Sequence, residues 1–233
     1  MAHTICNNLE SINRRIREAC QNCGRNPEEI TLVAISKTKP ASAVLEAAEC
    51  GQLHFGENKV QELTEKLDQI ERTDLIWHMV GALQTNKIKY LAGRIQWIHS
   101  IPKLKALKEV EKRARQEEAP INVLIQVNIS GEGQKSGCDP EELDEIIGYA
   151  GQLEYTRIRG LMGIASLVED PEQVRPEFKL LRTLKEKYQN AEEGNIQMDH
   201  LSMGMTNDLE VAIEEGATML RIGTAIFGKR NYT

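Results

Sequence analysis

Apolar runs and helical periodicities alternate along the chain and predict eight short strands separated by helices. Runs of strand length lie at 31–36, 53–56, 75–80, 95–98, 121–128, 157–161, 198–201 and 218–222. Between them, apolar residues recur at helical spacing, as in Val60, Leu63, Leu67 and Ile70. The helices expected after the first seven strands are 40–51, 60–70, 85–92, 103–117, 140–150, one carrying Val174, Phe178, Leu181 and Leu184, and 207–215.

This alternation predicts an α/β fold with a parallel sheet. Eight strand–helix units in 233 residues favour closure into a (β/α)8 barrel, the TIM barrel. The alternative is an open doubly wound sheet. Such a sheet usually carries a GxGxxG turn after its first strand, and this chain has none there.

One further helix precedes the first strand. Leu9, Ile12, Ile16 and Ala19 fall on one helical face, and Gly24 ends the pattern. Because little sequence follows the eighth strand, we expect this extra N-terminal helix to cover the gap in the outer ring. The chain contains no low-complexity tract or flexible linker, so we expect one domain over 1–233.

Composition and charge narrow the class of partner. The chain is 40% hydrophobic and 27% charged, with a formal net charge of −6 and no basic stripe, so no nucleic-acid partner is expected. No window approaches the ~18 apolar residues of a membrane span. The first residues lack the apolar core of a secretory signal. We therefore expect a cytoplasmic protein with no membrane contact.

The five cysteines fit that compartment. Cys20 and Cys23 form a CxxC, which suits a redox pair or half a metal site, but no second CxxC or histidine pair completes one. The other histidines, His54, His78, His99 and His200, lie in or beside strands and are spread along the chain. We expect each of them to have a hydrogen-bonded structural role, and we expect no metal site.

Lys37 is the first candidate for chemistry. It lies where the first predicted strand ends, and in a barrel the carboxyl ends of the strands carry the functional groups. A lysine partly desolvated there has a lowered pKa and can attack a carbonyl. By position alone, a surface lysine in a loop is an equally good interpretation.

Small and hydroxyl residues follow the last two strands. Ser202 and Gly204 end the seventh strand, and Gly223 and Thr224 end the eighth. Barrels often bind phosphate with these two loops, where glycines let backbone N–H groups approach the oxygens. Taken singly, each glycine is better explained as a tight turn and each hydroxyl as a helix cap. Their coincidence in both loops favours a phosphate site.

Arg221 lies inside the last apolar strand and needs a partner for its permanent charge. The partner is a structural salt bridge or, alternatively, the ring nitrogen of a bound cofactor. A reactive amine, a phosphate site and a cation at the ring nitrogen are the three things that pyridoxal 5′-phosphate needs.

Six motifs carry a resemblance to a known family. They are VAISKTKP, HFGENKVQE, VGALQTNKIK, QVNISGEGQKSG, RGLMGIA and LSMGMTNDLEVAIEEGATMLRIGTAIFG. In these motifs, from about residue 9 to the end, the chain resembles the pyridoxal phosphate homeostasis protein family. The resemblance implies a barrel like the N-terminal domain of alanine racemase. One departure is Lys59, where the family often has tyrosine.

The resemblance also implies roles for single residues. Lys37 would form the Schiff base, Arg221 would face the pyridine nitrogen, and Ser202, Gly223 and Thr224 would surround the phosphate. Asn58 would lie near the cofactor, and Lys135 would be an auxiliary cofactor-handling residue. Gln84, Asn86 and Lys87 either line the mouth of the barrel or cap a helix.

Two functions remain open at this point, a carrier that buffers and delivers pyridoxal phosphate and a pyridoxal-phosphate-dependent amino-acid racemase. Racemisation needs an acid–base group on each face of the substrate. In alanine racemases, a tyrosine from a second domain or partner subunit serves the second face. No tyrosine here lies at a predicted strand end, and we expect no second domain and a monomer. We therefore expect a non-catalytic carrier that meets apo-enzymes transiently. A link to vitamin B6, amino-acid and keto-acid balance is what the family resemblance implies. A barrel that binds another phosphate ester is the third interpretation.

Overall fold

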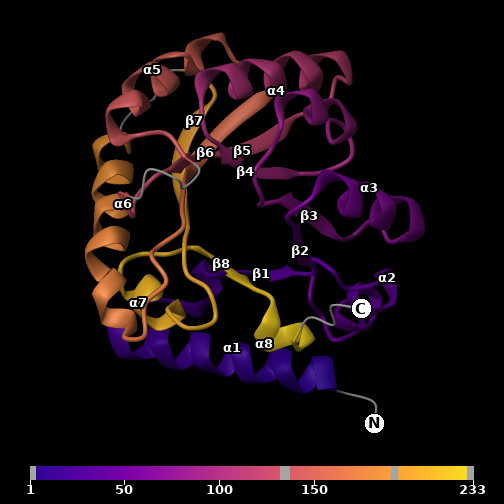
Figure 1. The fold of residues 1–233 in the computed structure, drawn as a ribbon, viewed down its shortest axis with the longest axis vertical. Coiled ribbons are helices and arrows are strands. Elements are labelled where there is room, and N and C mark those ends of the chain that lie inside the picture. The colour runs from indigo at the N-terminus through magenta and orange to yellow at the C-terminus, as the bar shows by residue number, and fades with distance from the viewer. Residues whose placement is uncertain (1–3, 132–136, 190–193, 230–233) are drawn as a thin grey trace.

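Eight parallel strands form a closed barrel in the computed structural model, which describes residues 4–131, 137–189 and 194–229 (Figure 1). Each strand pairs with the next, and β8 pairs with β1. The strands are β1 (Thr31–Ile35), β2 (His54–Glu57), β3 (Ile76–Met79), β4 (Trp97–Ile101), β5 (Ile121–Val127), β6 (Thr156–Gly163), β7 (Ile196–Ser202) and β8 (Met219–Ile222). All eight predicted strands are present, and the predicted barrel is confirmed.

The outer layer consists of helices that follow the strands. They are α2 (Ala41–Glu49), α3 (Val60–Gln69), α4 (Leu104–Gln116), α5 (Leu143–Gly148), α6 (Arg175–Lys187), α7 (Leu209–Glu214) and α8 (Thr224–Phe227). Most strands inside this layer are buried on both faces, which is why they appear in the sequence as nearly continuous apolar runs. The exceptions are β6 and β7, whose amino halves expose Arg157, Gln197 and Asp199. Within the described ranges, no helix is long and apolar enough to span a bilayer.

Two predicted helices differ from the structure. Residues 85–92 were expected to be an α-helix, but they form the 3-10 helix η2 (Thr85–Tyr90). Threonine, asparagine and tyrosine are poor helix formers, and a connection this short favours 3-10 geometry. The predicted helix 140–150 is divided into η3 (Pro140–Glu142), α5 and η4 (Ala150–Gln152), with glycine at positions 148 and 151.

The N-terminal helix α1 (Thr4–Cys23) lies across α7, α8 and α2, below β8 and β1 (Figure 1). It therefore covers the gap in the ring, as expected. Asn8 Nδ2 donates to the carbonyl of Ile226 at 2.8 Å. Arg15 donates to the carbonyl of Thr206 at 3.0 Å and pairs with Glu210 at 2.8 Å. Through these contacts, α1 supports the segments that follow β7 and β8.

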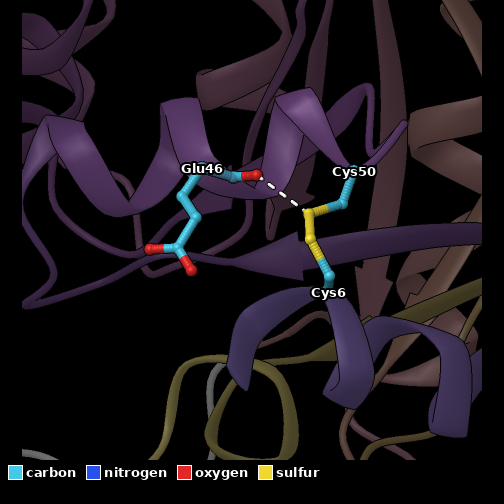
Figure 2. Close-up of a disulfide and its surroundings, with 3 residues drawn as sticks. All are labelled: Cys6, Glu46 and Cys50. Carbon is cyan, nitrogen blue, oxygen red and sulfur yellow. Dashed lines mark hydrogen bonds between the residues drawn. A yellow bond between two sulfur atoms is a disulfide. The ribbon is translucent and has the colours of Figure 1, made fainter. Parts of the chain in front are cut away.

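A disulfide joins α1 to the end of α2. Cys6 and Cys50 are bonded, with their Cα atoms 5.4 Å apart, and Glu46 lies beside the pair (Figure 2). The sequence did not predict this pairing, because spacing alone does not show which cysteines meet. Cys20 and Cys23 are both free, so the CxxC is not a disulfide in this structure.

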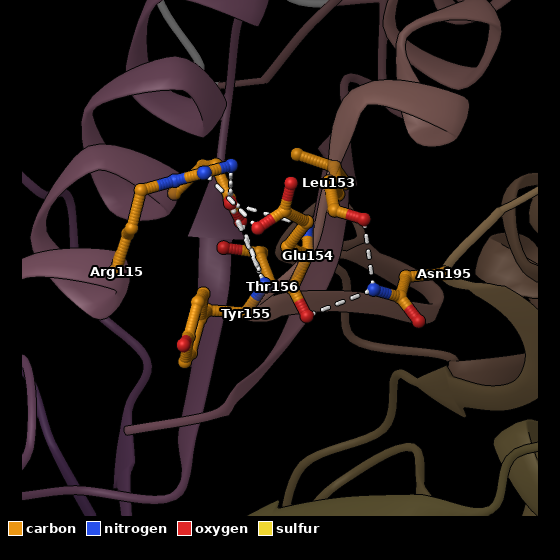
Figure 3. Close-up of polar contacts among 7 residues, drawn as sticks. Arg115, Leu153, Glu154, Tyr155, Thr156 and Asn195 are labelled. Atoms are coloured by element: carbon orange, nitrogen blue, oxygen red, sulfur yellow. Dashed lines mark hydrogen bonds and ion pairs between the residues drawn. The ribbon is translucent and has the colours of Figure 1, made fainter. Parts of the chain in front are cut away.

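Polar contacts gather around Leu153, Glu154, Tyr155 and Thr156 at the amino end of β6 (Figure 3). Glu111 of α4 accepts hydrogen bonds from the backbone N–H groups of Glu154 and Thr156 at 3.1 and 2.9 Å, and it pairs with Arg115. Burial alone would raise the pKa of Glu111, but these backbone bonds bring it below its usual value. Asn195 completes the junction by donating to Leu153.

Candidate functional site

A cavity of about 350 Å³ opens at the carboxyl ends of the strands. Five of the predicted site residues line it, namely Lys37, Asn58, Arg221, Gly223 and Thr224. They come from the ends of β1, β2 and β8, so the closed barrel brings together residues nearly two hundred positions apart. The volume falls within the range of small-molecule sites.

Lys37 lies on a tight turn that several hydrogen bonds hold. The N–H of Lys39 donates to the carbonyl of Ser36 at 3.0 Å. Thr38 has a positive φ of 63°, which is uncommon for a residue other than glycine, and its N–H donates to Glu62 Oε2 at 2.8 Å. The turn therefore has one defined conformation, with Lys37 half-buried at the cavity wall.

A buried ion pair lies directly under this turn. Glu57 has no exposed surface, and its Oε1 accepts from Ser36 Oγ at 2.7 Å and from Lys66 Nζ. Lys66 also donates to the carbonyl of Ser36 at 2.7 Å. Burial raises the pKa of Glu57, while Lys66 opposes that shift. Both charges thus fix the residue that immediately precedes Lys37.

Close backbone contacts shape the neighbouring walls. A Cβ at Gly81 would lie 2.2 Å from the carbonyl oxygen of Asn58, so only glycine fits beside this residue. A Cβ at Gly223 would lie 3.1 Å from the carbonyl oxygen of Ile35, on the strand that leads to Lys37. The turn after β8 therefore lies tightly against the end of β1.

Arg221 is buried at the cavity wall, and its hydrogen bonds to the described residues go to a hydroxyl and a carbonyl. Nη1 donates to Ser202 Oγ at 2.6 Å, and Nη2 donates to the carbonyl of Gly163 at 2.8 Å. Burial lowers the pKa of Arg221 to about 10, and Asp208 opposes the shift only in part. The structure thus disfavours the structural salt bridge and leaves a guanidinium facing the cavity.

Two predicted phosphate contacts are not at the cavity wall. Ser202 is fully buried, and its hydroxyl contacts Arg221 and His99. Gly204 packs against α7 and β8, where a Cβ would meet Ala212 at 2.6 Å. Lys135 lies outside the described residues.

Thr206 and Lys39 line the cavity but were not predicted. The segment Ser202–Thr206 contains two hydroxyls, and the sequence did not show which one faces the mouth. Lys39 is two residues after Lys37, and its Nζ donates to the carbonyl of Lys229 at 3.0 Å.

Other hollows lie nearby and at the opposite end. Gln84 and Lys87 line a hollow of about 600 Å³ that shares Asn58 with the cavity. Asn86 is not among the residues that line either hollow, so the structure does not decide between its two interpretations. A larger hollow of about 780 Å³ lies at the amino ends of β6 and β7. The carboxyl ends are where barrels carry function, so the smaller cavity is the better candidate.

The histidines have the structural roles that the sequence indicated. His54, His78, His99 and His200 each form a hydrogen bond. Within the part of the chain that the structure describes, no group of three or more histidines, cysteines and carboxylates is arranged to hold a metal ion.

Comparison with known proteins shows first the class of protein to which this chain belongs. Residues 7–231 match the alanine racemase N-terminal domain family. Proteins named "Pyridoxal phosphate homeostasis protein" from Aquifex aeolicus and Escherichia coli K12 are each 44% identical, covering 97% and 98% of this chain and 99% and 98% of their own lengths. The solved structure of PipY from Synechococcus elongatus with PLP bound has a TM-score of 0.84 at 32% identity, covering 97% of this chain and all of that one.

The barrel and its lysine-lined mouth thus define a protein of the alanine racemase N-terminal domain class. Within that class, the chain belongs to the pyridoxal phosphate homeostasis protein family.

Proposed function

We propose that this protein holds pyridoxal 5′-phosphate as a Schiff base on Lys37 and acts as a carrier that buffers and delivers the cofactor. One observation carries the proposal, namely that Lys37, Arg221, Gly223 and Thr224 line a single cavity. The named function of the relatives and the PLP-bound PipY structure support it.

The residues present fit the cofactor. Lys37 offers an amine for the aldehyde, and Arg221 offers a fixed cation for the ring nitrogen. Gly223, Thr224 and Thr206, which line the same cavity, offer a glycine and two hydroxyls for the phosphate. We assign Thr206 to the role that the sequence suggested for Ser202, whose hydroxyl is already engaged.

The lining of the cavity favours a carrier over a racemase. Among the described lining residues, the ionisable side chains are two lysines and one arginine. A racemase needs a second acid–base group opposite Lys37. An arginine at the ring nitrogen also leaves that nitrogen poorly protonated, which weakens electron withdrawal by the ring. We further propose a cytoplasmic monomer that meets apo-enzymes transiently.

The first experiment locates the covalent bond. Protein incubated with pyridoxal 5′-phosphate is reduced with borohydride, digested and mapped by mass spectrometry. We expect the label on Lys37 and a yellow protein that absorbs near ~420 nm, a property of such Schiff bases. Lys37→Ala should lose both signals. Lys39→Ala is the matched control, because it removes the neighbouring lysine and leaves Lys37 for attachment.

Two outcomes contradict the proposal. A label on Lys39 in place of Lys37 would refute the assigned lysine, and a colourless wild type that takes up no cofactor would refute the cofactor. Amino-acid racemisation near ~1 s⁻¹ by the pure protein would make it an enzyme and end the carrier interpretation.

A further inference from the structure

A continuous row of hydrogen bonds crosses the barrel interior from the cavity floor to the opposite side. Arg221 Nη1 lies 2.6 Å from Ser202 Oγ, and that oxygen lies 2.9 Å from His99 Nδ1. His99 Nε2 lies 2.8 Å from His78 Nδ1, and His78 Nε2 lies 3.0 Å from His54 Nδ1. These five residues come from β8, β7, β4, β3 and β2, and we call them the histidine row.

The arginine fixes the direction of every bond in the row. A guanidinium has donors only, so Ser202 Oγ accepts from Arg221. Among the described residues the other partner of this buried hydroxyl is His99 Nδ1, so we infer that the serine proton is donated to it. His99 then carries its proton on Nε2 and donates to His78 Nδ1. By the same step, His78 carries its proton on Nε2 and donates to His54. One tautomer is therefore assigned to each buried ring.

Burial keeps these rings neutral. His78, His99 and Ser202 have no exposed surface, and desolvation holds the pKa of both histidines well below the usual value. A neutral imidazole has one donor and one acceptor, which is what each inner position of the row uses. His54, the first residue of β2, is partly exposed and ends the row at the amino side of the barrel.

Trp97 packs against the histidine row and also against His200, a histidine that serves as the comparison residue. Its ring stacks on His78 at an interplanar angle of 11°, and it contacts both His99 and His200 edge-on. His200 bonds to Thr218 Oγ1 at 3.2 Å and is not part of the row. It is thus a half-buried histidine against the same indole with no link to Arg221.

We propose that His99 and His78 are positioning residues for Arg221, acting through Ser202 to hold the guanidinium in one orientation toward the cavity. The second fixed bond, from Nη2 to the carbonyl of Gly163, makes the planar group unable to rotate about the first. The fixed guanidinium would contact the ring nitrogen of pyridoxal phosphate, so this part of the inference rests on the proposed function. The row also accounts for the two hydrogen bonds that Ser202 Oγ makes inside the barrel.

The tautomers are tested in the protein without cofactor. Long-range ¹H–¹⁵N correlation spectra of the histidine rings should show the Nε2–H tautomer for both His78 and His99. Ser202→Ala should disturb the ring nitrogens of His99 and His78 and leave those of His200 in place. The inference is refuted if either ring carries its proton on Nδ1. It is also refuted if the His78 signals are unchanged in Ser202→Ala.

The positioning role is tested with added pyridoxal 5′-phosphate. Leucine and asparagine have the same shape, but only asparagine can accept from Ser202 near the position of Nδ1. We expect His99→Leu to weaken cofactor retention about tenfold and to shift the absorption maximum, as loss of one hydrogen bond to a buried charged network predicts. His99→Asn should restore most of both, and His200→Gln should change neither.

Equal losses in His99→Leu and His99→Asn would show that shape alone matters and would refute the role. The two arms separate this inference from the proposed function. If wild-type protein takes up no pyridoxal phosphate, the proposed function fails while the ring spectra still decide the row. If the wild type binds but the tautomers differ, only the row fails.

Discussion

Lys37 acquires its place from residues that do not touch the cavity. Glu57, Lys66 and Glu62 hold the backbone of Ser36 and Thr38 on either side of it. A lysine on a flexible turn would lose conformational entropy each time it bound a ligand, whereas the turn that carries Lys37 is already ordered. The buried pair under the turn therefore links stability to cofactor attachment.

We predict that Glu57→Gln lowers the free energy of unfolding by about 3 kcal/mol, because it leaves the Lys66 ammonium buried without its counter-charge. Attachment of the cofactor to Lys37 should slow in the same variant. Urea unfolding and the rate of absorbance increase on cofactor addition measure the two effects. The control is Glu186→Gln, which removes the carboxylate of the exposed Arg182–Glu186 pair on α6, where the ion pair itself is worth about 0–1 kcal/mol. Equal losses in the two variants would contradict the argument.

Residue-level prediction succeeded where position in a strand decides the outcome. Lys37 and Arg221 follow from the ends of apolar runs, and both line the cavity. Ser202 and Thr206 could not be ranked, because the direction of each side chain depends on how β7 ends in the barrel. The histidine row was missed for the same reason. The signal for the histidine row in the sequence is one histidine in each of three consecutive strands, which does not show that the rings meet. The cofactor contacts themselves stay predictions.

Helix α1 contributes to the site from the outer ring. Arg15 donates a hydrogen bond to the carbonyl of Thr206, and Asn8 donates one to the carbonyl of Ile226 in α8. The disulfide fixes the start of the same helix to the end of α2. An element that precedes the first strand thus steadies the loops after the last two.

We predict that Cys6→Ser, or reduction of the wild type, lowers stability by about 2–4 kcal/mol, since the cross-link spans 44 residues of sequence. Thermal unfolding with and without reductant measures the change. The matched control is Cys23→Ser, which alters an exposed free thiol on the same helix. Wild type that melts at one temperature in both conditions would show that the bond contributes nothing in solution.

At the level of elements, apolar runs located the strands because most of them are buried on both faces. Periodicity did not distinguish an α-helix from the 3-10 helix at 85–90, where six residues are too few for the two periods to separate. The disulfide was also beyond the sequence, since Cys6 and Cys50 meet only once α1 lies against α2.

The whole molecule keeps several histidines uncharged in its interior. Burial lowers the pKa of His200 to about 4 and those of His78 and His99 well below the usual value. In the unfolded chain these histidines bind protons as the pH falls below the ordinary histidine pKa of about 6.5. Their contribution to stability is therefore complete above that pH and is lost as the pH falls toward the folded-state values.

We predict that the free energy of unfolding decreases between about pH 6.5 and 4, by up to about 1.4 kcal/mol per pH unit for each such histidine. Glu57, whose pKa burial raises, acts in the opposite direction. Urea titrations at several pH values measure the slope. His200→Gln should make it shallower by one histidine's share, and an unchanged slope in that variant would contradict the assignment.

The placement of α1 has a consequence for synthesis. The segment leaves the ribosome before α7 and α8, two of the elements that it covers. Until they emerge, its apolar face at Leu9, Ile12 and Ile16 lacks part of its partner surface and is exposed to chaperones or to other chains. The outer ring of this barrel therefore closes only after α7 and α8 have been synthesised, long after α1.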